Sequence, residues 1–121
     1  MATGGVERLR RRADYLRVQA ADRRAALPGL LLQAAPGEDD MRRVGFTASR
    51  KVGNAVTRNR ARRRLKALAG EVLPQHAAPG YDYVLVARQA TPARDFAALR
   101  RDLENALKKL KLWHRQDGGA A

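Results

Sequence analysis

The sequence predicts an α+β fold: a single compact α/β sandwich with three helices and a sheet of about four strands. The chain has 121 residues, about the length of one domain, and its 45% hydrophobic content is enough for one core. Apolar residues recur at helical spacing in three segments, and runs of β-type residues lie between these segments. The elements are expected in the order helix, three strands, helix, strand, helix.

The N-terminal half is expected to form the first helix and the first three strands. Residues 6–21 are predicted to be helical, because apolar side chains recur there with a helical period. This stripe consists of Leu9, Ala13, Leu16 and Ala20. The turn signal at residues 27–29 separates two short extended segments. Residues 30–34 are predicted to be a strand, and residues 43–49 to be the second half of a hairpin with it.

The C-terminal half supplies two more helices and the clearest strand. Asn54 is expected to cap a helix that ends near Gly70, and residues 73–80 are expected to be a loop. Residues 81–87 are β-branched and aromatic without a breaker, which is typical of a strand. Asp95 is expected to cap the last helix.

The whole chain, residues 1–121, is expected to be one domain with its core over residues 7–110 and a flexible tail over residues 111–121. With 0 Cys it has neither a disulfide framework nor a thiolate metal site. Its longest apolar runs are far shorter than the ~20 residues of a membrane span, and no secretory signal is visible. We therefore expect a cytoplasmic protein that enters no membrane.

Charge is the unusual property of the chain: 25 basic and 12 acidic residues give a net charge of +13. Residues 41–70 contain no Asp or Glu. Their basic residues are Arg42, Arg43, Arg50, Lys51, Arg58, Arg60, Arg62, Arg63, Arg64 and Lys66. Like charges four residues apart on a helix repel each other, and phosphates would neutralise them. A guanidinium group can form two hydrogen bonds to the oxygens of one phosphate, so the pattern predicts a nucleic-acid partner.

Three other interpretations of this basic segment fit less well. A merely solvated helix would normally carry acidic residues one turn from the arginines. A membrane-surface helix would need Trp or Phe to enter the interface. A DNA-binding helix-turn-helix domain is usually all-helical, whereas residues 81–87 predict a strand.

Residues 51–66, Lys-Val-Gly-Asn-Ala-Val-Thr-Arg-Asn-Arg-Ala-Arg-Arg-Arg-Leu-Lys, resemble the signature of the protein component of bacterial ribonuclease P. The flanking segments 8–15, 43–50, 82–88 and 96–110 resemble the same family. The resemblance implies a sandwich with a left-handed βαβ crossover. It also implies a subunit that assists the Mg²⁺-dependent, endonucleolytic removal of the 5′ leader from precursor tRNA. The implied partners are ribonuclease P RNA and precursor tRNA, with Mg²⁺ held mainly on the catalytic RNA.

The resemblance also implies two sets of site residues. Those expected to bind the catalytic RNA are Lys51, Arg58, Asn59, Arg60, Arg62, Arg63 and Lys66. Those expected to bind the leader are Tyr15, Arg17, Thr47 and Ser49. Asn59 is expected either to contact RNA or to position a neighbouring side chain. Tyr15 is expected either to stack on a base or to belong to the core.

The sequence departs from the family pattern at three positions. Gln19 and Leu32 stand where the family commonly has aromatic residues towards the leader, and Lys66 replaces a more usual Arg. The first two changes weaken a stacking platform, and the third keeps the charge but loses the guanidinium fork. Leader binding is therefore expected to rely more on Arg17, Thr47, Ser49 and the signature helix.

The chain offers no convincing catalytic or metal-binding set of its own. His76 falls in a predicted loop, His114 in the predicted tail, and Asp39 and Asp40 form an adjacent pair in a polar turn. We expect the polypeptide to contribute electrostatics and positioning. Two rival functions stay open: a stand-alone or ribosome-associated RNA-binding protein, and an independent nuclease that uses the two histidines.

Overall fold

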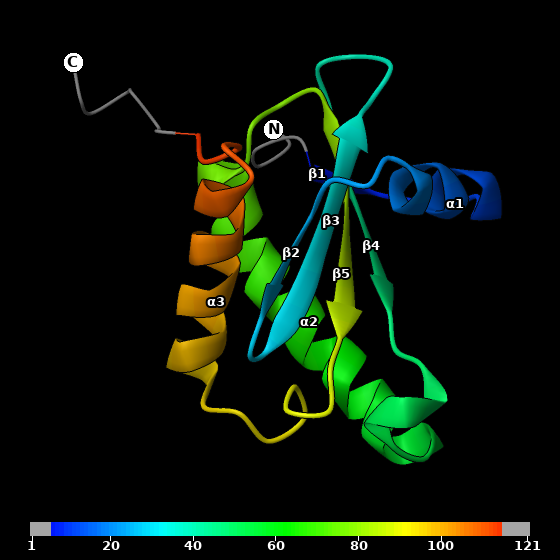
Figure 1. Cartoon of the computed structure of the whole chain (residues 1–121), viewed down its shortest axis with the longest axis vertical. Helices are drawn as coiled ribbons and strands as arrows, with labels where there is room; N and C mark the ends of the chain where they lie inside the picture. Colours follow the sequence, from blue (N-terminus) through cyan, green and yellow to red (C-terminus); the bar gives the residue numbers. More distant parts are fainter. Residues whose placement is uncertain (1–5, 115–121) are drawn as a thin grey trace.

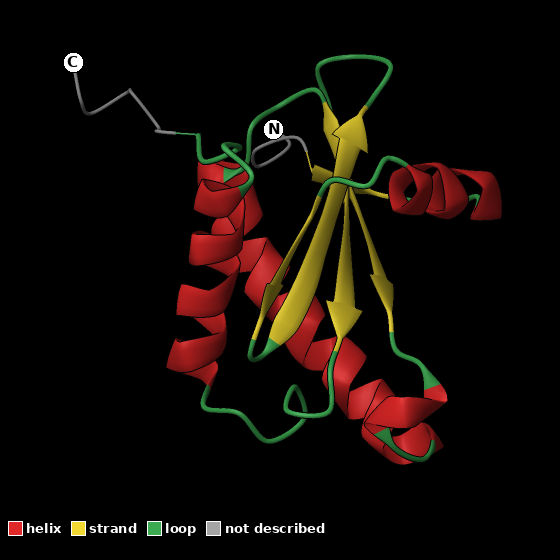
Figure 2. Cartoon of the chain, in the orientation of Figure 1, coloured by secondary structure: helices red, strands yellow, loops and turns green. Residues whose placement is uncertain are grey.

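The structure is a computed structural model that describes residues 6–114. Three helices accompany one sheet of five strands, one strand more than predicted (Figures 1 and 2). The strands are β1 (Val6–Arg8), β2 (Arg24–Leu27), β3 (Leu30–Pro36), β4 (Arg42–Thr47) and β5 (Tyr81–Ala87). The helices are α1 (Arg12–Ala20), α2 (Ala55–His76) and α3 (Phe96–Lys109), with a 3-10 turn, η1 (Arg50–Val52), before α2.

The strand order in the sheet is β1-β4-β5-β3-β2. The predicted hairpin between residues 30–34 and 43–49 is wrong, because β5 lies between β3 and β4. β4 and β5 pair in parallel, and α2 connects them. Figure 1 shows both strands pointing downwards, β5 to the left of β4 and α2 behind the sheet, so this crossover is left-handed. The handedness implied by the family resemblance is confirmed.

One face of the sheet, here called the helix face, is covered by α2 and α3 (Figure 1). Alternate residues of the strands point towards it, and those at the centre, such as Leu32 and Leu85, are 0% exposed. Tyr83 is also fully buried there, and its hydroxyl donates to the Ala78 carbonyl at 2.7 Å. Burial raises the pKa of Tyr83 above its ordinary value, so the phenol stays neutral.

The opposite face, here called the α1 face, is covered only in part. α1 packs over β3 and β5 and closes a small cluster formed by Leu9, Val18, Ala35 and Val84. Val18 is the one buried residue within α1. The predicted stripe fails here, because Ala13, Leu16 and Ala20 are exposed and Leu9 precedes the helix. The remaining part of this face stays open to solvent.

The start of α1 and the end of α2 differ from the prediction. Residues 6–8 form β1, which pairs with β4, so the first helix begins only at Arg12. α2 continues past Gly70 and Pro74 to His76. The first half of the predicted loop over residues 73–80 is therefore helical. Val72 and Leu73 are 0% exposed and anchor this last part of the helix to the core. The caps predicted at Asn54 and Asp95 are confirmed by their hydrogen bonds to Thr57 N and Ala98 N.

Residues 111–114, expected to start a flexible tail, pack against the end of α2. Leu112 is 3% exposed, and Trp113 forms an antiparallel bridge with Ala77. The Trp113 ring stacks on His76, with ring centroids 4.2 Å apart. Residues 115–121 of the expected tail lie outside the described residues.

Candidate nucleic-acid interface

The loop before α2 folds through local hydrogen bonds that its sequence specifies. Ser49 Oγ accepts from Lys51 N at 3.3 Å and starts η1, and Asn54 Oδ1 accepts from Thr57 N at 2.9 Å and starts α2. Gly53 has a φ of +149°, and a Cβ there would lie 2.9 Å from the Thr57 side chain. These residues fix the direction in which the basic helix leaves the sheet.

The first half of α2 presents a basic surface next to β1 and β4. Asn59, Arg62, Arg63 and Lys66 line a hollow of about 230 Å³ there, together with Arg8 and Phe46. None of the described residues that line this hollow is acidic. We call these six residues the α2 basic surface. Arg62 Nη2 donates to Asn59 Oδ1 at 2.7 Å, so Asn59 holds the guanidinium of a neighbour in place.

The other predicted cations of this segment lie near the same end of α2. Arg60 and Lys51 are exposed, whereas Arg58 is half-buried and donates to the Gly53 carbonyl at 3.0 Å. Arg64 turns away from this surface and donates to the Thr91 carbonyl at 2.7 Å, with its guanidinium 5.9 Å from the Phe96 ring centroid. The segment therefore contains both solvent-facing and structural arginines.

A second candidate surface lies on the α1 face, where Tyr15 and Thr47 line one cleft together with Leu16 and Gln19. The Tyr15 ring rests on β4 at Gly45, where a Cβ would lie 2.5 Å from the ring. Tyr15 is half-buried, so the ring packs on the sheet and still borders the cleft. The two interpretations of Tyr15, core residue and cleft residue, are therefore compatible.

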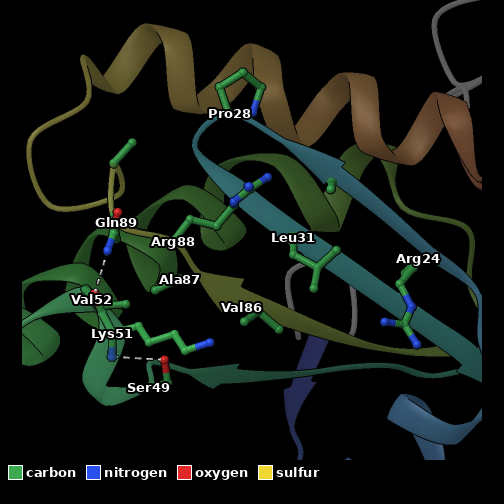
Figure 3. A pocket seen from close by; sticks show the side chains of 12 residues that line it. Arg24, Pro28, Leu31, Ser49, Lys51, Val52, Val86, Ala87, Arg88 and Gln89 are labelled. Carbon is green, nitrogen blue, oxygen red and sulfur yellow. Dashed lines mark hydrogen bonds between the residues drawn. The ribbon is translucent and has the colours of Figure 1, made fainter.

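Another hollow of the open α1 face lies beside η1 (Figure 3). Leu31 and Val86 form its apolar floor, and Ser49, Lys51 and Arg24 border it. The hollow has a volume of about 760 Å³. An aliphatic floor bordered by cations suits a single strand whose bases lie on the sheet and whose phosphates meet the rim.

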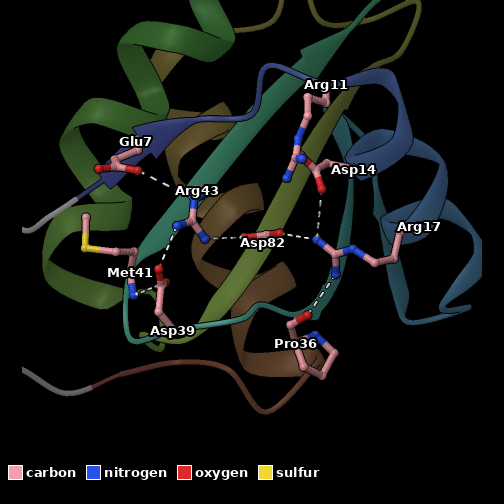
Figure 4. A network of polar contacts seen from close by, with 9 residues as sticks. All are labelled: Glu7, Arg11, Asp14, Arg17, Pro36, Asp39, Met41, Arg43 and Asp82. Atoms are coloured by element: carbon pink, nitrogen blue, oxygen red, sulfur yellow. Dashed lines mark hydrogen bonds and ion pairs between the residues drawn. The ribbon is translucent and has the colours of Figure 1, made fainter.

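Arg17, a predicted leader residue, lies apart from these hollows. Its guanidinium bonds the buried carboxylate of Asp82 and donates to the Pro36 carbonyl at 2.8 Å (Figure 4). Arg43 lies on the other side of Asp82 and donates to Asp39 at 2.8 Å, which lowers the pKa of the Asp39 carboxyl. Asp39 is thus paired with a cation and does not face solvent alone.

Strand register identifies residues that sequence reasoning misplaced or missed. Leu32 was expected towards the leader, but it is 0% exposed on the helix face, and its neighbour Leu31 points into the open hollow. The alternation of strand residues separates Leu31 from Leu32 once the pairing of β3 with β5 is known. Arg8 was missed because β1 was predicted to be helical.

Within the described residues 6–114, no three His, Cys, Asp or Glu side chains gather to hold a metal ion. The two histidines meet through their backbones, where His114 N donates to the His76 carbonyl at 2.6 Å, and the His76 ring is stacked on Trp113. No helix in the described part of the chain has the length and apolarity to cross a membrane. The arrangement offers charge and shape for binding.

These features define a small basic α/β domain with two candidate binding surfaces for a polyanion, one on α2 and another on the open sheet face. The family model for ribonuclease P matches residues 5–111. A protein described as ribonuclease P protein component from Paramagnetospirillum magneticum is 53% identical over 110 residues, covering 87% of this chain and 83% of that protein. The corresponding protein from Ruegeria pomeroyi is 48% identical over 113 residues, covering 90% of each chain.

Solved structures agree with the sequence comparisons. The ribonuclease P protein of Staphylococcus aureus aligns with a TM-score of 0.74 and 26% identity, covering 94% of this chain and all of that chain (100%). The ribonuclease P protein of Thermotoga maritima aligns with a TM-score of 0.73 and 26% identity, covering 85% of this chain and 96% of that chain. The chain belongs to the ribonuclease P protein component family.

Proposed function

We propose that this protein is the RNA-binding and substrate-positioning subunit of ribonuclease P, with the α2 basic surface on the catalytic RNA and the open α1 face on the 5′ leader of precursor tRNA. The observation that carries the proposal is the separation of the two surfaces by the sheet. Arg62, Arg63 and Lys66 lie on the helix-face side of β4, whereas Tyr15 and Thr47 lie on its other side. One small domain is thereby able to contact two RNA segments at once.

Charge and exposure support the assignment of the α2 basic surface to the catalytic RNA. Arg63 and Lys66 are exposed, and the described residues that line the hollow between them and β4 have only basic, amide and aromatic side chains. Phosphates neutralise such a surface and release counterions, which makes binding depend strongly on salt. With about six phosphates contacted, a log–log salt slope of roughly −4 to −5 is expected.

The α1 face suits a single strand of variable sequence. Tyr15 supplies a ring beside the cleft, and stacking of a base on such a ring is worth roughly 1–3 kcal/mol. Gln19, Leu31 and Val86 supply no further ring, so most of the leader would lie on an amide and aliphatic surface. Ser49 and Lys51 border the far end of this path and are placed to meet its backbone.

We place the Mg²⁺ of the reaction on the catalytic RNA and the assembled enzyme in the cytoplasm. Asp39, in the turn between β3 and β4, is paired with Arg43, and Asp82, on β5, is paired with Arg17. A divalent cation would have to displace these guanidinium groups. The polypeptide's part is therefore to hold RNA segments in place while the RNA and its metal ions carry out the hydrolysis.

Reconstitution tests this function. The protein is mixed with a bacterial ribonuclease P RNA and a precursor tRNA at low Mg²⁺, and the 5′ ends of the products are mapped. Mature 5′ ends should appear only when protein and RNA are both present. Cleavage by the protein alone would favour the rival nuclease, and a lack of any stimulation would favour a stand-alone RNA-binding protein.

A charge-matched pair of variants tests the assignment of the α2 basic surface. Arg62→Ala with Arg63→Ala should weaken binding of the catalytic RNA and reduce the salt slope by about 1.5, because two phosphate contacts are lost. Arg101→Ala with Lys109→Ala removes the same charge from exposed positions on α3. This control should leave the slope close to that of the unmodified protein. Equal effects of the two pairs would show that only net charge matters.

A further inference from the structure

The carboxylate of Asp82 lies beneath α1, between two guanidinium groups (Figure 4). Its side chain is 3% exposed. Arg17 from α1 bonds Oδ2, and Arg43 Nη1 from β4 lies 3.7 Å from Oδ1. A buried carboxylate therefore links the first helix to the middle of the sheet.

The two arginines depend on this carboxylate to different degrees. Arg43 keeps two other acidic partners, Asp39 at 2.8 Å and Glu7 at 3.5 Å. Arg17 has Asp14 at 3.7 Å, but Asp14 lies on α1 itself and cannot attach that helix to the sheet. The Asp82 carboxylate and the Pro36 carbonyl are the groups outside α1 that Arg17 bonds.

The apolar attachment of α1 is small. The helix has nine residues, and Val18 is the one that is buried. Tyr15 adds a ring over Gly45, whereas Leu16 and Gln19 are exposed. Because Tyr15, Leu16 and Gln19 all line the cleft, any tilt of α1 changes the shape of the leader site.

We propose that Asp82 is a positioning residue for leader binding, which holds α1, and with it the Tyr15 side of the cleft, through Arg17. The inference rests on the proposed function, because it assumes that the α1 face binds the leader. Arg17 then acts through Asp82: its positive charge pairs with the Asp82 carboxylate and does not contact the leader. Neutralising Asp82 would leave the two guanidinium groups facing each other without the charge between them, and α1 would be pushed away from the sheet.

The test measures leader-dependent binding by the assembled holoenzyme. Two precursor tRNAs are compared, one with a leader of about eight nucleotides and one with a single nucleotide, at several salt concentrations. Asp82→Asn should raise KM for the long-leader substrate by about fivefold. It should leave kcat, the KM of the short-leader substrate and the salt slope unchanged. An unchanged long-leader KM, or an equal rise for both substrates, would overturn the proposal.

Asp102→Asn is the matched control for lost stability. Asp102 is likewise a buried carboxylate, bonded to Arg94 at 2.7 Å and to Gly29 N at 2.9 Å, but it lies on α3 beside the β2–β3 turn. This variant should lose stability without a leader-specific change in KM. A leader-specific loss in both variants would show that general destabilisation is the cause.

Arg17→Gln shows whether Arg17 acts through Asp82. Its effect should equal that of Asp82→Asn, and the double variant should be no worse than either single one. A direct phosphate contact by Arg17 would instead lower the salt slope by about 0.7 and add to the Asp82 effect, which would contradict the proposal. If Asp82→Asn does not fold, Arg17→Gln alone decides: a leader-specific rise in KM with an unchanged salt slope supports the proposal, and a lowered slope or an unchanged KM overturns it. If the unmodified holoenzyme binds both substrates equally, the proposed leader site itself is wrong.

Discussion

The two faces of the sheet are built for different tasks, although the same strands form both. On the helix face, Leu32, Tyr83 and Leu85 are 0% exposed beneath α2 and α3. On the α1 face, Val84 is 0% exposed under α1, whereas Val86, two residues further along the same strand, is only half-buried. Burial on the α1 face thus ends where its short helix ends.

This difference shows how a small domain keeps a binding surface open. The helix face holds most of the apolar core, so stability does not require the other face to be closed. The α1 face combines a few buried contacts with ion pairs at its edge and a solvent-exposed floor. Changes to buried residues of the helix face should therefore act mainly on folding, and changes to exposed residues of the α1 face should act mainly on leader binding.

The largest expected effect comes from truncating a buried side chain that packs on the helix face. Leu103 on α3 is 0% exposed. Leu103→Ala should lower the free energy of unfolding by about 2–5 kcal/mol, because it removes buried apolar contacts and leaves a cavity. Urea denaturation followed by circular dichroism measures the loss. Leader affinity per folded molecule should not change.

Leu16 on the α1 face provides the contrast to Leu103. It is 50% exposed and lines the cleft beside Tyr15. Leu16→Ala should change the free energy of unfolding by less than about 0.5 kcal/mol. A loss of stability comparable to that of Leu103→Ala would show that the α1 face contributes as much to folding as the helix face.

A smaller effect is expected at the contact between α1 and the sheet. Gly45→Ala places a methyl group 2.5 Å from the Tyr15 ring, so the ring or the helix must move. The variant should lose about 1–3 kcal/mol of stability and should also weaken leader binding. Thermal melts and titration with leader-bearing precursor tRNA measure the two losses.

Gly70→Ala is the matched glycine control. A Cβ at Gly70 meets nothing within 4 Å, and the residue lies within α2. This variant should gain roughly 0.5–1 kcal/mol of stability, because alanine favours a helix interior. Leader binding should be unchanged. A leader-binding defect in Gly70→Ala would show that the weaker leader binding of Gly45→Ala does not come from the Tyr15 contact.

Patterns of local origin predicted much of the fold, and non-local pairing accounts for what they missed. The caps at Asn54 and Asp95 and the strand over residues 81–87 depend on neighbouring residues, and all three are confirmed. The insertion of β5 between β3 and β4 depends on pairing between residues 39 to 57 positions apart, such as Arg43 with Asp82 and Leu30 with Ala87, which no short pattern records. The false hairpin follows directly from assuming that neighbours in sequence are neighbours in the sheet.

Helix α2 shows how tertiary packing overrides a local stop signal. Gly70 and Pro74 indicate an end to the helix, yet it continues to His76 because Val72 and Leu73 are buried in the core. Pro74 removes the hydrogen bond to the Gly70 carbonyl, but Gly70 is exposed and water can reach that oxygen. The loss is therefore small compared with the apolar burial of the last turn.

The candidate site shows a similar division between residue type and placement. The sequence identified the basic segment, and Arg62, Arg63 and Lys66 do share one surface with Asn59. It could not tell which arginines of that segment hold the fold together, because residue type does not reveal which carbonyl a side chain reaches. Arg64 within the segment illustrates this point, and Arg17 outside it does so too, since both bond groups distant in sequence.

The last comparison separates structural from RNA-facing arginines within α2. Arg64 bonds the carbonyl of Thr91, a residue that is 0% exposed, whereas Arg60, one helical turn earlier, is exposed. Arg64→Ala should cost about 1 kcal/mol of stability, because that carbonyl loses its charged donor. Arg60→Ala should leave stability unchanged and reduce the salt slope of RNA binding by about 0.7–0.9, the share of one phosphate. Each variant is the other's control, since both remove one guanidinium from the same helix. If both moved the salt slope equally and neither moved the melting temperature, the division of this helix into structural and RNA-facing arginines would be wrong.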